Sequence, residues 1–213
     1  MKNRSKLSLL IVCLSFLINS LASAATDTLI FHNSVWRYLD NGTNQGKPWR
    51  NLAFVDTSWK SGFAELGYGD GGEATVVSFG PNAKYKYITT YFRKKFIVEN
   101  PLQYTTLTLD LLRDDGAMVY LNGTLVLADN MPTTGSIGYK TLAVNDVIGA
   151  DESTFYSYAI PLSLLISGDN VLCVEIHQRR QGNSDISFNC RLRADYTPCT
   201  IEPTNAVSNI GLL

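Results

Sequence analysis

The chain has 213 residues, with 45 % hydrophobic and 17 % charged side chains and a formal net charge of −1. Its basic residues form only short runs, Arg93-Lys94-Lys95 and Arg179-Arg180. Nucleic-acid binding needs an extended basic stripe, so the charge pattern excludes nucleic acid as a partner.

The N-terminal segment has the pattern of a secretory signal peptide. Lys2, Arg4 and Lys6 precede an apolar run from Leu7 to Leu21, and Ala22-Ser23-Ala24 places small residues at the −3 and −1 positions. Polar residues interrupt the run, which is short for a membrane anchor. We therefore expect residues 1–24 to be removed, a secreted, periplasmic or cell-surface location, and no membrane span afterwards.

Residues 25–196 are predicted to form one β-sandwich domain. The three basic residues of the signal segment leave 15 of the 18 Lys and Arg against all 19 Asp and Glu, so the mature chain carries a net charge of −4. About 190 residues is a size that an all-β sandwich fills as one domain.

Eight strand-like runs alternate in hydrophobicity or are rich in β-branched and aromatic residues. In chain order they are residues 29–39, 88–98, 105–112, 117–121, 124–127, 153–160, 171–178 and 185–192. Turn-rich loops join them, and helical periodicity is weak outside the signal segment. This pattern predicts antiparallel sheets packed as a sandwich or jelly roll.

The connections carry turn signals. Glycine-rich segments at 40–49, 67–73 and 80–87 are predicted as loops, and 161–170 as a compact connection with one helical turn. Asn122-Gly123 lies between two strand-like runs and predicts a hairpin with a type I′ turn, because both central positions of that turn need φ > 0. Residues 197–213 have two prolines and no strong period, which predicts a tail or a truncated linker.

Cysteine use fits an exported chain without fixing a disulfide. Cys173, Cys190 and Cys199 remain after the signal segment, so one bond is possible, either Cys173–Cys190 or Cys190–Cys199. Cys173 and Cys190 lie inside apolar strand patterns, and two buried thiols are an equal alternative. No Cys/His cluster suggests zinc.

Three stretches resemble a known family. They are WRYLDNGTNQGKPWR…FVDTSWKSGFAELGYGDG (36–71), YFRKKFIV with LLRDDGAMVYLNGTLV (91–98 and 111–126), and PLSLLISGDNVLCVEIHQ…SDISFNCRL (161–192). Together they resemble the galactose-binding-domain-like jelly roll of exported bacterial proteins. The second stretch is also similar to the sugar-binding domain of β-galactosidase-type glycoside hydrolases.

The resemblance implies a non-catalytic accessory module that binds carbohydrate or a cell-surface glycan. Such modules accompany a metallophosphoesterase, a lamin-tail-like domain or another partner domain. The alternative is a structural module that packs between domains and has no small ligand, because a fold of this class does not determine its function.

Asp114-Asp115, followed by Gly116, is the leading site candidate. Two adjacent carboxylates repel each other, and a hard cation such as Ca²⁺ relieves that repulsion. The pair resembles the Asp-Asp turn that holds calcium in the protective-antigen-type sugar-binding domains of yeast adhesins. The alternative is an Asx-turn beside a hairpin strand.

Two further acidic loop pairs extend the predicted metal and ligand site. They are Asp70 with Glu73, and Asp151 with Glu152, and each could join a calcium site or contact ligand hydroxyl groups. The alternative is ordinary solvated carboxylates. The predicted metal ligands are Asp114, Asp115, Asp70, Glu73, Asp151 and Glu152, with Ca²⁺ as the cofactor.

Aromatic residues in the predicted loops could stack on a sugar ring or plug the ends of the sandwich. These residues are Trp49, Tyr68, Tyr85, Tyr87 and Tyr139. The ligand-binding residues predicted from all these patterns are Asp114, Asp115, Tyr68, Asp70, Trp49 and Tyr85.

Catalysis is not predicted. His32 and His177 are the two histidines, and His177 ends an apolar strand where a structural role is expected. No G-x-S-x-G elbow is present. A glycosidase needs two carboxylates, so Asp114, Asp115, Asp151 and Glu152 leave glycoside hydrolysis as the alternative.

Overall fold

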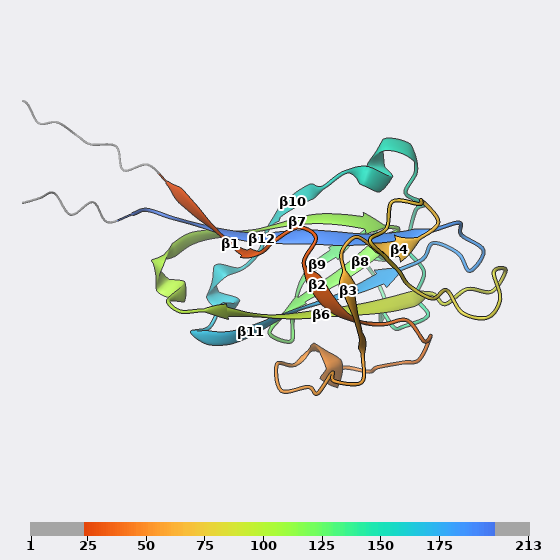
Figure 1. Ribbon diagram of the computed structural model, residues 1–213, viewed down its shortest axis with the longest axis horizontal. Helices are drawn as coiled ribbons and strands as arrows, with labels where there is room; N and C mark the ends of the chain where they lie inside the picture. The colour runs from red at the N-terminus through yellow and green to blue at the C-terminus, as the bar shows by residue number, and fades with distance from the viewer. Residues whose placement is uncertain (1–23, 199–213) are drawn as a thin grey trace, which may run out of the picture.

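The computed structural model describes residues 24–198, which form two stacked β-sheets (Figure 1). The predicted signal segment before Ala24 and the predicted tail beyond residue 198 lie outside the described residues. The predicted fold class is confirmed, because the described chain contains strands and short 3₁₀ turns and no α-helix. Among residues 24–198, no helix is long and apolar enough to cross a membrane.

The first sheet, sheet A, has the strand order β10-β7-β12-β4-β5, and β1 also pairs with β12. Its strands are β1 (Ala25–Ile30), β4 (Leu66–Tyr68), β5 (Thr75–Val76), β7 (Tyr104–Asp114), β10 (Tyr156–Ala159) and β12 (Ile186–Tyr196). All neighbours are antiparallel except β4 and β5, which are parallel.

The second sheet, sheet B, is antiparallel throughout and has the order β3-β2-β6-β11-β8-β9. Its strands are β2 (Val35–Leu39), β3 (Lys60–Phe63), β6 (Thr89–Val98), β8 (Gly116–Leu121), β9 (Thr124–Asp129) and β11 (Gly168–His177). The 3₁₀ turns are η1 (Pro48–Arg50), η2 (Pro101–Gln103), η3 (Gly149–Ser153) and η4 (Leu162–Leu164).

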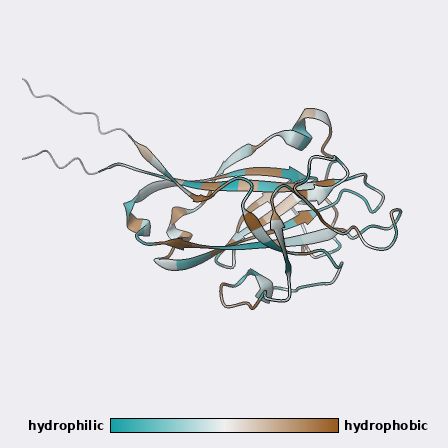
Figure 2. Cartoon of the chain, viewed as in Figure 1, coloured by the Kyte–Doolittle hydropathy of each residue, from teal (hydrophilic) through white to brown (hydrophobic). Residues whose placement is uncertain are grey.

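The main core lies between the two sheets. Alternate residues of the long strands face inward, for example Leu109 and Leu111 of β7 and Phe188 of β12, and all three are buried. Figure 2 shows the matching alternation of brown and teal along these strands. The period of two therefore places the polar residues of β7 and β12 on the outer face of sheet A.

A second core covers the outer face of sheet B. The η1 loop and the loop after β9 pack over β6, β8 and β11, so a second group of apolar side chains is buried there. Trp49 lies at its centre, stacked on Trp59 and edge-on to Tyr91 and Tyr120. Burial of this aromatic group fixes the η1 loop and the loop after β9, which supply Arg50 and Tyr139 to the aromatic site described below.

The predicted hairpin is confirmed. β8 and β9 are joined by Asn122 and Gly123, with φ of 51° and 88°. The Asn122 side chain also accepts from the Val171 amide at 2.9 Å and donates to the Leu164 carbonyl at 2.9 Å. The turn residue therefore ties the hairpin to β11.

Several predicted elements differ in detail. The run 29–39 is two strands, because a turn with Asn33 at φ 59° breaks it and sends β1 and β2 into different sheets. Segment 67–73, predicted as a loop, begins inside strand β4. Of the disulfide alternatives, Cys173 and Cys190 are buried free thiols, and Cys199 lies outside the described residues.

Candidate functional site

Asp114 and Asp115 lie where the chain crosses from one sheet to the other. Asp114 ends β7 in sheet A, and Gly116 begins β8 in sheet B. Asp114 is opposite Ser187 of β12, so both side chains lie on the outer face of sheet A. Both aspartates are fully buried. The candidate pair is therefore enclosed, and residues 147, 179 and 183 from distant parts of the chain contact Asp115.

Asp115 is a satisfied structural carboxylate. Its Oδ1 accepts from the Val147 amide at 2.9 Å, and its Oδ2 accepts from the Arg179 amide at 2.6 Å and from Asn183 Nδ2 at 2.7 Å. All three donors are far away in sequence, so this arrangement is not a local Asx-turn. Asp115 instead anchors the loops on either side of it.

Asp114 is the unsatisfied member of the pair. Within the described residues, neither of its buried oxygens has a hydrogen-bond donor. Burial raises the pKa of Asp114 well above its usual range, and the neighbouring carboxyls of Asp115 and Asp185 raise this pKa further. A buried carboxylate without a donor is costly, so this position needs a proton or a cation.

Beside Asp114 lies a hollow of about 330 Å³, which we call the acidic pocket, lined by Glu65, Asp70, Gly72, Gly149, Glu152 and Ser153. Ser187 links it to the strand, since its hydroxyl lies 3.0 Å from Glu65 Oε1 and 2.8 Å from Asp70 Oδ2. Burial raises the pKa of the Asp70 carboxyl, and nearby Asp185 and Glu152 add to this rise.

The structure gathers some of the six predicted metal ligands and separates others. Asp70 and Glu152 line the acidic pocket. Glu73 instead accepts from the Asp70 amide at 3.0 Å, and Asp151 accepts from the Tyr156 hydroxyl at 2.7 Å. In the described part of the chain, no three His, Cys, Asp or Glu side chains form a group that could hold a metal ion. Among residues 24–198, the unpartnered carboxylate of Asp114 is the feature that best fits a cation.

Three of the predicted loop aromatics meet on the other side of the β11–β12 connection (residues 178–185). Tyr85, Tyr87 and Tyr139 line one hollow of about 170 Å³ together with Gln181 of that connection. Tyr139 also lines an adjoining hollow of about 230 Å³ with Tyr91 and Asn44. We call the two hollows the tyrosine groove.

The floor of the groove is polar, and its buried carboxylate is paired, although the buried Arg50 Nε has no acceptor among the described residues. Glu175 of β11 is buried, and its two oxygens pair with Arg50 Nη2 at 2.9 Å and His177 Nε2 at 3.1 Å. The Arg50 guanidinium also stacks over the Tyr120 ring at 4.0 Å. His177 is therefore a structural histidine held by Thr89 and the Thr141 carbonyl. The groove combines aromatic walls with fixed hydrogen-bonding groups, a pattern that suits a sugar.

Two predicted ligand-binding aromatics are core residues instead. Trp49 is fully buried in the second core, and Tyr68 lies in β4 with its hydroxyl bonded to Gln178 and its ring beneath the Lys86 ammonium. Their placement in glycine-rich sequence suggested loops, but packing against distant strands buries both. Tyr85 is 59 % exposed and is available to a ligand.

Asp185 was missed by the sequence reasoning. It adjoins Asp114 and Asp70 and contributes to the raised pKa of both carboxyls. Its position as the first residue of the predicted strand 185–192, at the same end of the sandwich as Asp114, is the signal that could have identified it. The antiparallel pairing of β7 with β12 brings the two ends together.

No protein-family model matches this sequence, and no curated protein matches it. The fold is similar to that of solved glycosidases. A calcium-binding mutant of Bacteroides uniformis β-glucuronidase 2 matches with a TM-score of 0.51 and 18 % identity, covering 81 % of this chain and 18 % of that one.

Two further solved structures give the same result. A glycosyl hydrolase family 2 member from Bacteroides cellulosilyticus has a TM-score of 0.51 and 12 % identity, covering 78 % of this chain and 20 % of that one. A β-glucuronidase from glycoside hydrolase family 2 has a TM-score of 0.50 and 14 % identity, covering 80 % and 18 %. This chain thus spans about a fifth of their length and shares a β-sandwich fold with that part of them.

Proposed function

We propose that this protein is a non-catalytic carbohydrate-binding module of an exported protein. The observation that carries the proposal is the tyrosine groove, where two loops bring Tyr85, Tyr87 and Tyr139 beside a fixed Arg50–Glu175 pair. Likeness to one β-sandwich of much longer glycosidases supports an accessory role. The predicted signal segment supports export to the periplasm, the cell surface or the medium.

A glycan array and titration calorimetry test this function. Tyr139 lines both hollows, so we expect Tyr139→Ala to weaken binding of the best glycan at least tenfold, about 1.4 kcal/mol. The matched control is Tyr156→Ala, since Tyr156 is also a half-buried tyrosine and lines neither hollow. Absence of binding to every glycan would contradict the proposal.

A calcium ion between Asp114 and Asp185, next to the acidic pocket, is the second part of the proposal, and the unpartnered Asp114 carboxylate supports it. Asp114 and Asp185 would supply two ligands, and main-chain and water oxygens would complete the six to eight that Ca²⁺ takes. At a Ca²⁺ concentration of 100 times its Kd, we expect the folded state to be stabilised by about 2.7 kcal/mol. Chelator should reverse the rise in Tm, and Asp185→Asn should abolish it. An unchanged Tm in Ca²⁺ would refute the site.

The alternative role, a structural module within a larger exported protein such as a metallophosphoesterase, also has a specific observation. Val35 of β2 and Phe63 of β3 are cross-strand neighbours, and both are exposed, 42 % and 60 %. Together these two side chains form an apolar surface suited to packing against another domain. This role predicts no glycan binding, which the same array decides.

A further inference from the structure

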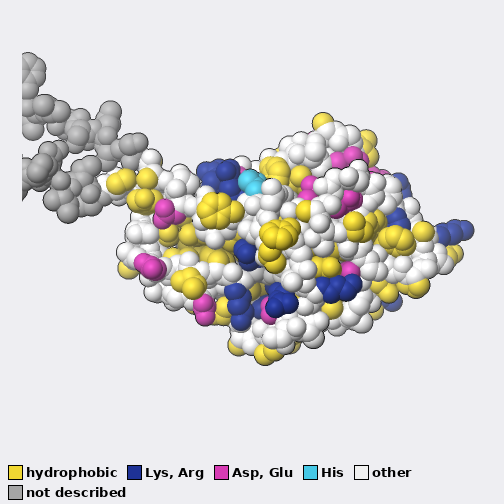
Figure 3. Space-filling view, viewed as in Figure 1, with side chains coloured by type: hydrophobic (Ala, Val, Ile, Leu, Met, Phe, Trp, Pro, Cys, Tyr) yellow, Lys and Arg dark blue, Asp and Glu magenta, His cyan; other side chains and the backbone are white. Residues whose placement is uncertain are grey.

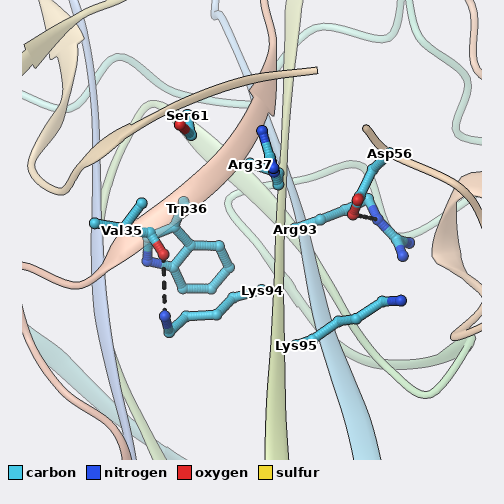
Figure 4. Close-up of a pocket in the computed structure, with 8 residues that line it drawn as sticks. All are labelled: Val35, Trp36, Arg37, Asp56, Ser61, Arg93, Lys94 and Lys95. Carbon is cyan, nitrogen blue, oxygen red and sulfur yellow. Dashed lines mark hydrogen bonds and ion pairs between the residues drawn. The ribbon is translucent and has the colours of Figure 1, made fainter. Parts of the chain in front are cut away.

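A cavity of about 290 Å³ opens where β2 separates from β6 (Figure 4). β2 pairs with β6 only from Arg37 to Leu39, while its first residues continue along β3. The cavity is lined by Val35, Trp36, Arg37, Asp56, Ser61, Arg93, Lys94 and Lys95. The Lys94 ammonium reaches across the gap and donates to the Val35 carbonyl at 3.0 Å.

The charges around this cavity do not balance. Four cationic side chains line it, and Asp56 is the one carboxylate in the lining. Asp56 is already taken by Arg93, which is fully buried and pairs with it at 2.9 Å. Within residues 24–198, Arg37, Lys94 and Lys95 form no ion pair with a carboxylate. Figure 3 shows the resulting gathering of Lys and Arg side chains over β2, β3 and β6, although the whole chain is slightly acidic.

The partners that these cations do have are neutral. Arg37 Nη1 donates to the Trp59 carbonyl at 3.2 Å. The other N–H groups of the Arg37 guanidinium remain available as donors. Lys94 is half-buried with a carbonyl partner, and burial lowers the pKa of its ammonium. A cation removed from water without a counterion is destabilised, so an anion beside it would restore the lost interaction.

Trp36 supplies an independent sign of a missing acceptor. Its indole lines the cavity and is 1 % exposed, and within the described chain its buried Nε1–H has no hydrogen-bond partner. A buried donor that lacks a hydrogen-bond acceptor lowers the folding stability by about 1–3 kcal/mol. The lining therefore holds three cations without carboxylate partners and, beside them, one buried N–H without an acceptor.

We propose that the cavity between β2 and β6 is a binding site for an oxyanion, a carboxylate or sulfate group, presented by an acidic saccharide or as a small free ion. Arg37 offers the planar donor set that binds such groups in a bidentate manner, and Lys95 and Ser61 lie at the open side. No residue of this cavity lines the tyrosine groove, so this site goes beyond the proposed function and can be tested separately.

Nuclear magnetic resonance on the folded chain tests the site directly. The protein has three tryptophans, so each indole N–H can be followed while ligand is added at constant ionic strength. The probes are sodium sulfate, a trigalacturonate and a neutral glucose trisaccharide, with sodium chloride as reference. We expect saturable shifts of the Trp36 indole N–H with sulfate, with trigalacturonate or with both, and none with the neutral sugar.

The pattern of responses identifies the source of the anion. Saturation by trigalacturonate alone assigns the site to an acidic saccharide, and equal saturation by sulfate shows that the oxyanion group is sufficient. Shifts that are linear and reproduced by chloride would overturn the proposal, because they report ionic strength only.

Charge-removing variants provide the second measurement. Arg37→Gln and Lys95→Gln should each weaken anion binding at least fivefold while leaving Tm unchanged, since both side chains are exposed. Lys84→Gln is the matched control, an exposed lysine that lines none of the three sites. Wild-type affinity in Arg37→Gln would refute the site even if an anion binds elsewhere. Tyr139→Ala should not change sulfate binding, which separates this result from a failure of the glycan proposal.

Discussion

The 178–185 connection borders both the tyrosine groove and the surroundings of Asp114, and the buried carboxylates of these two regions have different partners. In the groove, both oxygens of Glu175 have a partner, and Arg50 is shared between that carboxylate and an aromatic ring. Next to the acidic pocket, Asp114 lies close to other carboxylates and has no donor among the residues described. The buried carboxylate of the groove is thus neutralised without a ligand, whereas Asp114 lacks a positively charged partner.

The tyrosine groove therefore has the properties of a recognition surface, whereas the occupancy and protonation of the Asp114 region depend on pH and cations. A preformed surface with satisfied groups binds a ligand with little rearrangement. A buried carboxylate without a partner makes folding stability depend on pH and on cations. Three substitutions can test whether the two regions are independent.

Trp49→Ala should have the largest effect, because Trp49 is the buried centre of the core beneath the groove loops. Deleting a buried tryptophan side chain costs about 3–5 kcal/mol of unfolding free energy. Urea denaturation measures the loss. If the regions are independent, the variant keeps the wild-type pH dependence of stability, and a loss below about 1 kcal/mol would contradict the assigned packing.

Asp114→Asn should act on the acidic pocket alone. The pKa of Asp114 is raised on folding, so the folded state holds its proton more tightly than the unfolded state does. Its contribution to stability is full below the ordinary carboxyl pKa of about 4 and decreases as the pH rises. We therefore compare the free energy of unfolding of Asp114→Asn with that of the wild type, without added metal, by urea unfolding. We expect this difference to favour the variant by about 1–3 kcal/mol more at pH 8 than at pH 5. Identical pH profiles for variant and wild type would contradict the unpaired state of Asp114.

Tyr85→Ala should have the smallest effect on stability, within about 0.5 kcal/mol, because the side chain is mostly exposed. Glycan affinity should nevertheless fall, as calorimetry would show. Loss of stability comparable to that of Trp49→Ala would mean that the groove aromatics are packing residues and not a recognition surface.

The sequence predicted the scaffold well because its signals are local. Alternation along residues 88–98 and 185–192 predicted β6 and β12 to within a few residues, and Asn122-Gly123 predicted the hairpin turn. The short strands β3, β4 and β5 were missed because they lie in glycine-rich sequence and are held by pairing with β2 and β12 rather than by their own propensity.

The site was harder to predict because burial depends on contacts that are distant in sequence. Local patterns identified Asp114 and Tyr85, but they could not show that loops cover Asp114 or that Trp49 is a core residue. The partners of Asp115 come from residues 147, 179 and 183, which no spacing rule connects. The cationic cavity depends on the separation of β2 from β6, a feature of strand pairing that composition does not reveal.

The 178–185 connection supplies Gln181 to the tyrosine groove and Asp185 to the neighbourhood of Asp114, and Lys86 holds it through the carbonyls of Asn183 and Ser184. One short segment thus belongs to two potential binding equilibria. If calcium changes the affinity for glycan by some factor, thermodynamic linkage requires that glycan changes the affinity for calcium by the same factor. Measuring the glycan affinity with and without calcium, and the calcium affinity with and without glycan, would therefore show how strongly this segment couples the two sites.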